Sequence, residues 1–143
     1  MPFRYRDDIA KADVAFEASG TSIGELFAAA ADATMNIMVE DIATIEKKQE
    51  LSVELENEEL DLLLFGFINE LIFLKDTRHL LLRVEKISIR KTDTKYLLNA
   101  TVYGEEPDPE KHSLCVDVKA TTLHQFSVKQ TGEGWLATVV LDI

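Results

Sequence analysis

The sequence contains a single cysteine, Cys115, among its 143 residues, together with only three prolines and six glycines. One cysteine excludes an internal disulfide and is typical of a protein from a reducing compartment. No stretch rich in proline or glycine interrupts the chain, so the composition marks no linker between domains. We therefore expect one domain that spans residues 1–143.

Long apolar runs are also missing. The most apolar stretch, residues 60–74, is too short to span a bilayer and contains Asp61 and Glu70. The first thirteen residues lack an apolar segment of signal-peptide length. We therefore expect a cytoplasmic protein that has no membrane partner.

Basic residues are scarce, with 15 Lys and Arg against 26 Asp and Glu and a net charge of −11. The imbalance lies in residues 1–71, which hold 16 acids and 5 bases, whereas residues 72–143 hold 10 of each. Phosphate binding draws its affinity from Lys and Arg, so we expect no direct binding of nucleic acid. The acidic half is compatible with a basic protein partner, although solubility alone would also explain it.

Motifs for common chemistries are absent from the sequence. There is no G-x-G-x-x-G, P-loop or G-x-S-x-G motif, and His79, His112 and His124 do not show the spacing of a zinc site. We therefore expect a protein that is not itself an enzyme.

Apolar periodicity predicts more strands than helices. Ser22 and Glu25 form a capping box before an amphipathic helix, and Asn57 is expected to cap a second helix with an acidic first turn and Lys75 near its end. Strands are predicted over residues 12–18, 42–54, 80–90, 96–103, 114–120, 124–130 and 135–143. The predicted fold class is α+β, with a largely antiparallel sheet, or two such sheets, and two packed α-helices.

Two acids and one base are candidates for a functional site. Asp142 ends an apolar strand beside the α-carboxylate of Ile143, and we expect its surroundings to be buried, so that the carboxylate needs a partner. Oxygen ligands of this kind favour a hard cation such as Ca²⁺ or Mg²⁺. Asp13 lies in the first predicted strand, where spacing alone favours an ordinary solvated acid. Lys119 is the one base in the strand-like segment 114–120, and two interpretations stay open. Its stem lies along the polar surface, or its charge faces a nucleotide phosphate or an acid of a partner.

Four segments in register, "ADVAFEA", "GEEPDPEKH", "VKATTLHQFSV" and the terminal "GW…DI", resemble the archease family over nearly the whole chain. Archeases are small cytosolic proteins that assist RtcB-type RNA ligases in tRNA splicing and RNA repair. They promote guanylylation of the ligase and its multiple turnover. The resemblance therefore implies a metal-binding activator whose partner is an RtcB-type RNA ligase.

The resemblance also implies roles for particular residues. Asp13, Asp142 and Ile143 would be the metal ligands, with calcium as the ion and magnesium or manganese as alternatives, and Lys119 would be a required base that faces the partner or its nucleotide. The family often has His-Thr where this chain has Ala10 and Lys11.

Two other functions stay open. One is a chaperone-like modulator of RNA-modifying enzymes such as tRNA methyltransferases. The other is a metal-dependent hydrolase, which is disfavoured because no general base or nucleophile is evident beside the proposed ion.

Overall fold

The computed structural model describes residues 2–6 and 13–143, and within them the strands form two antiparallel sheets. The first sheet has the order β1-β2-β7-β6, with β1 at Phe3–Tyr5, β2 at Val14–Gly20, β7 at Gly134–Asp142 and β6 at Ala120–Thr131. The second has the order β3-β5-β4, with β3 at Gln49–Asn57, β5 at Tyr96–Glu105 and β4 at Leu81–Lys91. Two α-helices, α1 at Ile23–Met38 and α2 at Leu60–Arg78, and a short 3₁₀ helix, η1 at Ile42–Thr44, complete the fold. The predicted α+β class with two helices is confirmed.

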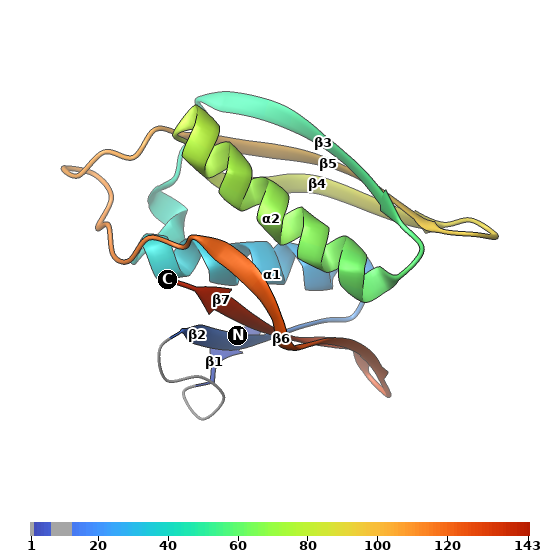
Figure 1. Ribbon diagram of the computed structural model, residues 1–143. Helices are drawn as coiled ribbons and strands as arrows, with labels where there is room; N and C mark the ends of the chain where they lie inside the picture. The colour runs from blue at the N-terminus through green and yellow to red at the C-terminus, as the bar shows by residue number, and fades with distance from the viewer. Residues whose placement is uncertain (1, 7–12) are drawn as a thin grey trace.

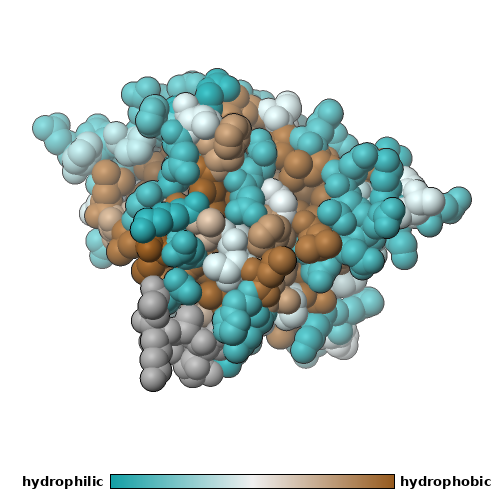
Figure 2. Space-filling view, viewed as in Figure 1, coloured by the Kyte–Doolittle hydropathy of each residue, from teal (hydrophilic) through white to brown (hydrophobic). Residues whose placement is uncertain are grey.

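Both helices lie between the two sheets (Figure 1). Helix α1 contacts β2 and β4, whereas α2 contacts β6 and β3, so each helix joins one sheet to the other. Helix α2 and strand β6 lie at the front of Figure 1, and Figure 2 shows the surface of this same face. None of the helices in the described residues is both long and apolar enough to cross a lipid bilayer.

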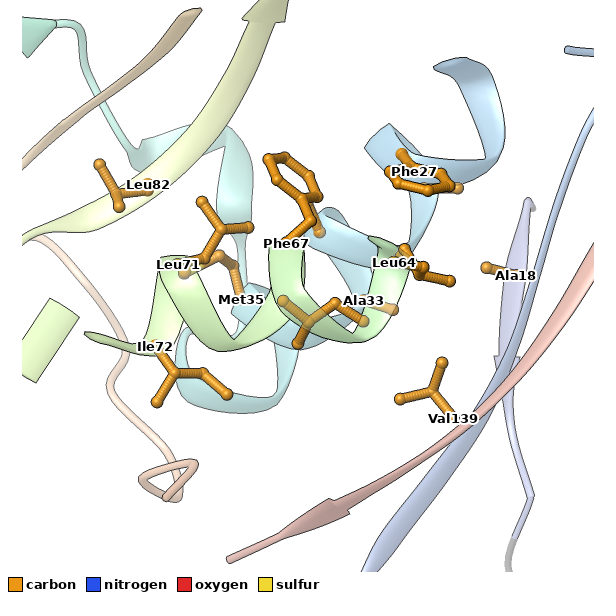
Figure 3. Packing of buried hydrophobic residues seen from close by; sticks show 14 of the residues in the cluster. Ala18, Phe27, Ala33, Met35, Leu64, Phe67, Leu71, Ile72, Leu82 and Val139 are labelled. Atoms are coloured by element: carbon orange, nitrogen blue, oxygen red, sulfur yellow. The ribbon is translucent and has the colours of Figure 1, made fainter. Parts of the chain in front are cut away.

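The core is a single cluster of buried side chains to which both helices and both sheets contribute. The ring of Phe67 on α2 stacks against Phe27 on α1, with centroids 6.0 Å apart, and both side chains are fully buried. Figure 3 shows these two rings in the middle of the cluster, with side chains from the helices and from each sheet around them: Leu64, Leu71, Met35, Leu82 and Val139. The two sheets are therefore held together through the helices.

Helix α1 begins where the sequence predicts. The backbone N–H of Glu25 donates to the Ser22 hydroxyl oxygen at 3.1 Å, so this side chain satisfies one of the free amides of the first turn. For α2 the predicted cap is wrong. Asn57 is the last residue of β3, and its side chain accepts from the N–H of Glu59 two residues on, an arrangement that closes a turn before the helix.

Two predicted strands differ from the structure. The strand expected over 42–54 is η1 followed by β3, which begins at Gln49 and extends to Asn57. The segment 114–120, including Cys115, is no strand: it makes one isolated bridge, Leu114 to Val39, and β6 begins only at Ala120. Leu114, Cys115 and Val116 are all exposed. Alternation of apolar and polar side chains predicted a strand here. The strand does not form because the backbone of the segment bonds to separate elements, at Met38 and at Asp142, and not to one neighbouring strand.

Candidate functional site

The two central strands of the first sheet, β2 and β7, bring Asp13 and Asp142 to the same end of that sheet. Strands β2 and β7 are antiparallel, and the pair Val14–Leu141 is the last of their ladder. Asp13 immediately precedes Val14, and Asp142 immediately follows Leu141, so the two acids occupy the same end of the same strand pair. Opposed positions in an antiparallel pair place their Cβ atoms about 4.5–5.5 Å apart. The pairing of β2 with β7 therefore leaves the two acids near each other.

The expectation that Asp142 lies in buried surroundings is wrong. Val139, Val140 and Leu141 are completely buried, but Asp142 itself is exposed and Asp13 is half-buried. Strand β7 crosses the core and emerges from it at its last residue, so water reaches the carboxylate. Because water solvates the carboxylate of Asp142, this group does not need a cation as a partner. A cation site here is supported only by the chemistry of the available oxygen ligands.

Lys119 joins this end of the sheet through its backbone. Its N–H donates to the carbonyl oxygen of Asp142 at 2.8 Å, and the following residue, Ala120, pairs with Asp142 in the β6–β7 ladder. The side chain of Lys119 is exposed. The backbone of Lys119 therefore lies at the same end of the first sheet as Asp13, Asp142 and Ile143.

Lys75 on α2 binds the chain segment that precedes Lys119, a structural role that was not predicted from the sequence. It is 8% exposed, and its ammonium group donates to the carbonyl oxygen of Val118 at 2.8 Å and to the carboxylate of Asp117 at 2.5 Å. Asp76 lies at 2.8 Å from the same group. The signal was present in the sequence, because Lys75 continues the core-facing stripe of α2, where a charge must find partners.

A second cluster anchors the "GEEPDPEKH" loop to the body of the protein. The carboxylate of Glu105 is 7% exposed and accepts from Lys111 Nζ at 2.7 Å and from the N–H of Glu46 at 2.6 Å. The buried ring of His112 accepts at Nδ1 from the N–H of Asp108, and its Nε2 lies 3.4 Å from the carboxylate of Glu105. The "GEEPDPEKH" motif therefore has a structural role, because Glu105, Lys111 and His112 attach the loop to the body of the protein. We call these contacts the Glu105 clamp.

The Glu105 clamp predicts a specific response to acid. Burial disfavours the charged carboxylate, but the hydrogen bonds from Lys111 and from the Glu46 amide outweigh burial and hold the pKa of Glu105 below its ordinary value of 4.5. A lowered folded-state pKa stabilises the protein above the ordinary value, and this contribution is lost as the pH falls through the folded-state pKa. In urea unfolding between about pH 7 and pH 3, we expect Glu105→Gln to be less stable than the wild type at neutral pH and to lose less stability in acid.

The matched control is Glu106→Gln, because Glu106 is the neighbouring carboxylate and is exposed. This variant should follow the wild-type curve. Parallel acid curves for Glu105→Gln and the wild type would contradict a stabilising charge at Glu105.

The oxygen atoms at the end of the sheet are of the kind that a hard divalent cation prefers. Within the described residues, no group of three or more His, Cys, Asp or Glu side chains is arranged to hold a metal ion. The expected ligand set of Asp13, Asp142 and Ile143 has only two acidic side chains, and the side chain of Ile143 packs against the core, so only its main chain is left as a ligand. The positions Ala10 and Lys11, where the family often has His-Thr, lie outside the described residues.

Comparison with known proteins defines the class to which this fold and site belong. The model of the Archease protein family (MTH1598/TM1083) matches residues 3–143. The chain therefore belongs to the archease family.

Individual relatives agree with this assignment. The archease of Pyrococcus furiosus is 38% identical over 133 residues, covering 92% of this chain and 93% of the relative, and that of Archaeoglobus fulgidus is 34% identical over the full length of both. The solution structure of protein 1598 of Methanobacterium thermoautotrophicum superposes with a TM-score of 0.85 at 32% identity and 99% coverage of each chain. The crystal structure of a Thermotoga maritima archease, described as a possible chaperone, shares the fold with a TM-score of 0.64 at 20% identity, covering 96% of each chain.

Proposed function

We propose that this protein is a non-enzymatic activator of an RtcB-type RNA ligase, and that it promotes guanylylation of the ligase and its multiple turnover. The observation that carries the proposal is the meeting of Asp13, Asp142 and Lys119 at one solvent-facing end of the first sheet. These residues come from three distant parts of the chain, and a surface position makes them available to a partner. Membership of the archease family supports the same reading.

The carboxylates of Asp13 and Asp142, with the main-chain end at Ile143, would hold a divalent cation, calcium in the first place and magnesium or manganese as alternatives. When bound, such an ion supplies positive charge that can face phosphate oxygens. Calcium takes six to eight oxygen ligands. This set of three groups leaves positions for water or for oxygen atoms of a partner, which suits a site that is completed in a complex.

Lys119 would place a positive charge beside the acidic groups. Its backbone N–H bonds to Asp142, and the carbonyl oxygen of the preceding Val118 bonds to Lys75, so the main chain is held while the side chain is exposed. The charge is then available for a nucleotide phosphate or for an acid of the ligase. The acidic N-terminal half of the chain complements the basic surface that an RNA ligase needs for its substrate.

The alternative is a chaperone-like modulator of RNA-modifying enzymes such as tRNA methyltransferases. The Thermotoga maritima relative is described as a possible chaperone. A direct assay separates the two proposals: the protein is added to the RNA ligase of its host, and the covalent ligase–nucleotide adduct is followed over time. Faster adduct formation supports the activator. An unchanged adduct rate, together with recovery of a methyltransferase from aggregation, would favour the chaperone.

In the adduct assay, Lys119→Ala should lower stimulation by about tenfold or more, the lower range of what charge complementarity contributes to association rates. Because the ammonium group is solvent-exposed, the folded structure should survive, and calorimetric titration with Ca²⁺ should show ion binding little changed. Lys129→Ala is the matched control, since Lys129 is an exposed lysine of β6, the strand that follows Lys119, and lies away from the site. Loss of the fold in Lys119→Ala would show that the lysine stem has a packing role.

A further inference from the structure

Helix α2 and strand β6 run side by side in opposite directions. The rings of Phe65 and Phe126 meet edge to face with centroids 5.7 Å apart, and the side chain of Asn69 accepts from the N–H of Thr121 at 3.1 Å. Further along, Lys75 reaches the carbonyl oxygen of Val118. The C-terminal end of α2 therefore lies beside the N-terminal end of β6, close to the candidate site.

Three large apolar side chains are exposed on these two elements. Leu62 is 38% exposed and Phe73 57% exposed on α2, and Leu123 is 59% exposed on β6. With the half-buried Phe65 and Phe126 they make up what we call the α2–β6 surface. Figure 2 shows hydrophobic residues across the centre of this face, with hydrophilic residues on both sides.

An irregularity in β6 places Leu123 in solvent. Thr122 pairs with Val140 and Ser127 pairs with Thr138, so four residues of β6 lie opposite one residue of β7. Within this bulge Gln125 has φ of 51°, an uncommon conformation for a residue other than glycine. The bulge and the positive φ of Gln125 are energetically unfavourable, and so is the exposed leucine. Bulges of this kind commonly redirect side chains at functional surfaces.

Gly66 opens a gap in the middle of the helical part of this surface. A Cβ atom added at Gly66 would meet nothing within 4 Å, so packing inside the protein does not explain a glycine there. Glycine in the middle of a helix is less favourable than alanine. The open position lies one turn from Leu62 and leaves room for a close approach from outside.

The charges of α2 beside this surface are acidic. Asp61 and Glu70 are half-buried and Asp76 is exposed, whereas Lys75 is directed inward to its own partners. The exposed cations of the two elements lie near their ends, Arg78 as the last residue of α2 and Lys129 near the end of β6. A second copy of this chain would bring the same carboxylates face to face and would carry the same net charge of −11. The complementary occupant is a different protein, with apolar side chains bordered by Lys and Arg.

We propose that the α2–β6 surface is the docking surface for such a basic-rimmed protein, a proposal that rests on the proposed function in taking the RNA ligase as that partner. Phe73 lies between Asn69 and Lys75 in the helix. Asn69 bonds to Thr121 and Lys75 bonds to Val118, and these two partners flank Lys119 in the chain. The surface therefore leads directly to the candidate site. A partner that covers it is held with its own groups beside Asp13, Asp142 and Lys119.

The test uses the full-length protein and the purified ligase of its host, with binding and adduct formation measured separately. Phe73→Ser and Leu123→Ser remove side chains that are mostly in solvent, so neither leaves a cavity. Each should weaken binding to the ligase by roughly 10- to 30-fold, the cost of losing an interface anchor. Adduct formation at saturating concentration should be retained. Leu114→Ser is the matched control, because Leu114 is 45% exposed but pairs with Val39 away from this surface.

The outcomes separate the two proposals. If the wild type binds the ligase and the Phe73 and Leu123 variants bind equally well, the docking surface is wrong. If the wild type binds without accelerating adduct formation, the activator function fails, while weaker binding of the two variants still supports the docking surface. If the wild type does not bind the ligase, the assignment of this surface to it is overturned. Sedimentation showing a wild-type dimer that Phe73→Ser dissociates would instead assign the surface to a second copy.

Discussion

Asp13→Ala is expected to lower stimulation of ligase guanylylation by at least about 10- to 100-fold, the loss usual for residues that only support a metal ligand. The substitution removes one of two carboxylates that meet at the end of the β2–β7 ladder. It creates no cavity in the core, and it relieves repulsion between like charges, so the free energy of unfolding should change little. The measurements are the rate of adduct formation and a calorimetric titration with Ca²⁺.

Two companion variants sharpen this test. Asp142→Asn keeps the size of the side chain but removes its charge, and it should reproduce the loss in both measurements. Asp93→Ala changes an exposed acid in the turn between β4 and β5 and should stimulate the ligase as well as the wild type. Full stimulation by Asp13→Ala would show that Asp13 is only a surface acid.

Phe67→Ala should reduce the free energy of unfolding by about 3–5 kcal/mol, which is the range for truncating a buried phenylalanine. The Phe67 ring is fully buried and stacks on Phe27 between the two sheets. Removing it leaves a cavity at the place where both helices join the sheets, and such a loss is a large part of the stability of a typical domain. Urea denaturation followed by circular dichroism would measure it.

The matched control is Phe73→Ala on the same helix, because Phe73 is 57% exposed. It should change the free energy of unfolding by less than about 0.5 kcal/mol, as surface substitutions usually do. Similar losses in the two variants would contradict the assignment of Phe67 to the shared core.

Local patterns predicted most elements of the fold. The Ser22–Glu25 capping box marked the start of α1 because an N-cap is satisfied by residues within one turn. The strands β4, β5, β6 and β7 were predicted because apolar and polar residues alternate in them and short turns separate them. The three-residue strand β1 was missed, since so short a segment has no measurable period.

The segments that were mispredicted depend on partners far away in the chain. Residues 114–119 have the alternating pattern of a strand, but their backbone bonds to Met38 and Asp142, and Lys75 donates to the carbonyl oxygen of Val118. Asn57 looks like a helix cap but ends β3, because pairing of β3 with β5 continues to that residue. In both cases a tertiary contact outweighed a local preference.

The sequence by itself determined the class of fold, the limits of most elements and the identity of the candidate residues, the last through resemblance to archeases. Only the tertiary structure decided that Asp13, Asp142 and Lys119 share one end of a sheet, that Asp142 is solvated, and that Lys75 is a buried anchor. The reason is physical: periodicity reports which face of one element is apolar, whereas burial and proximity depend on where the chain brings its distant parts together.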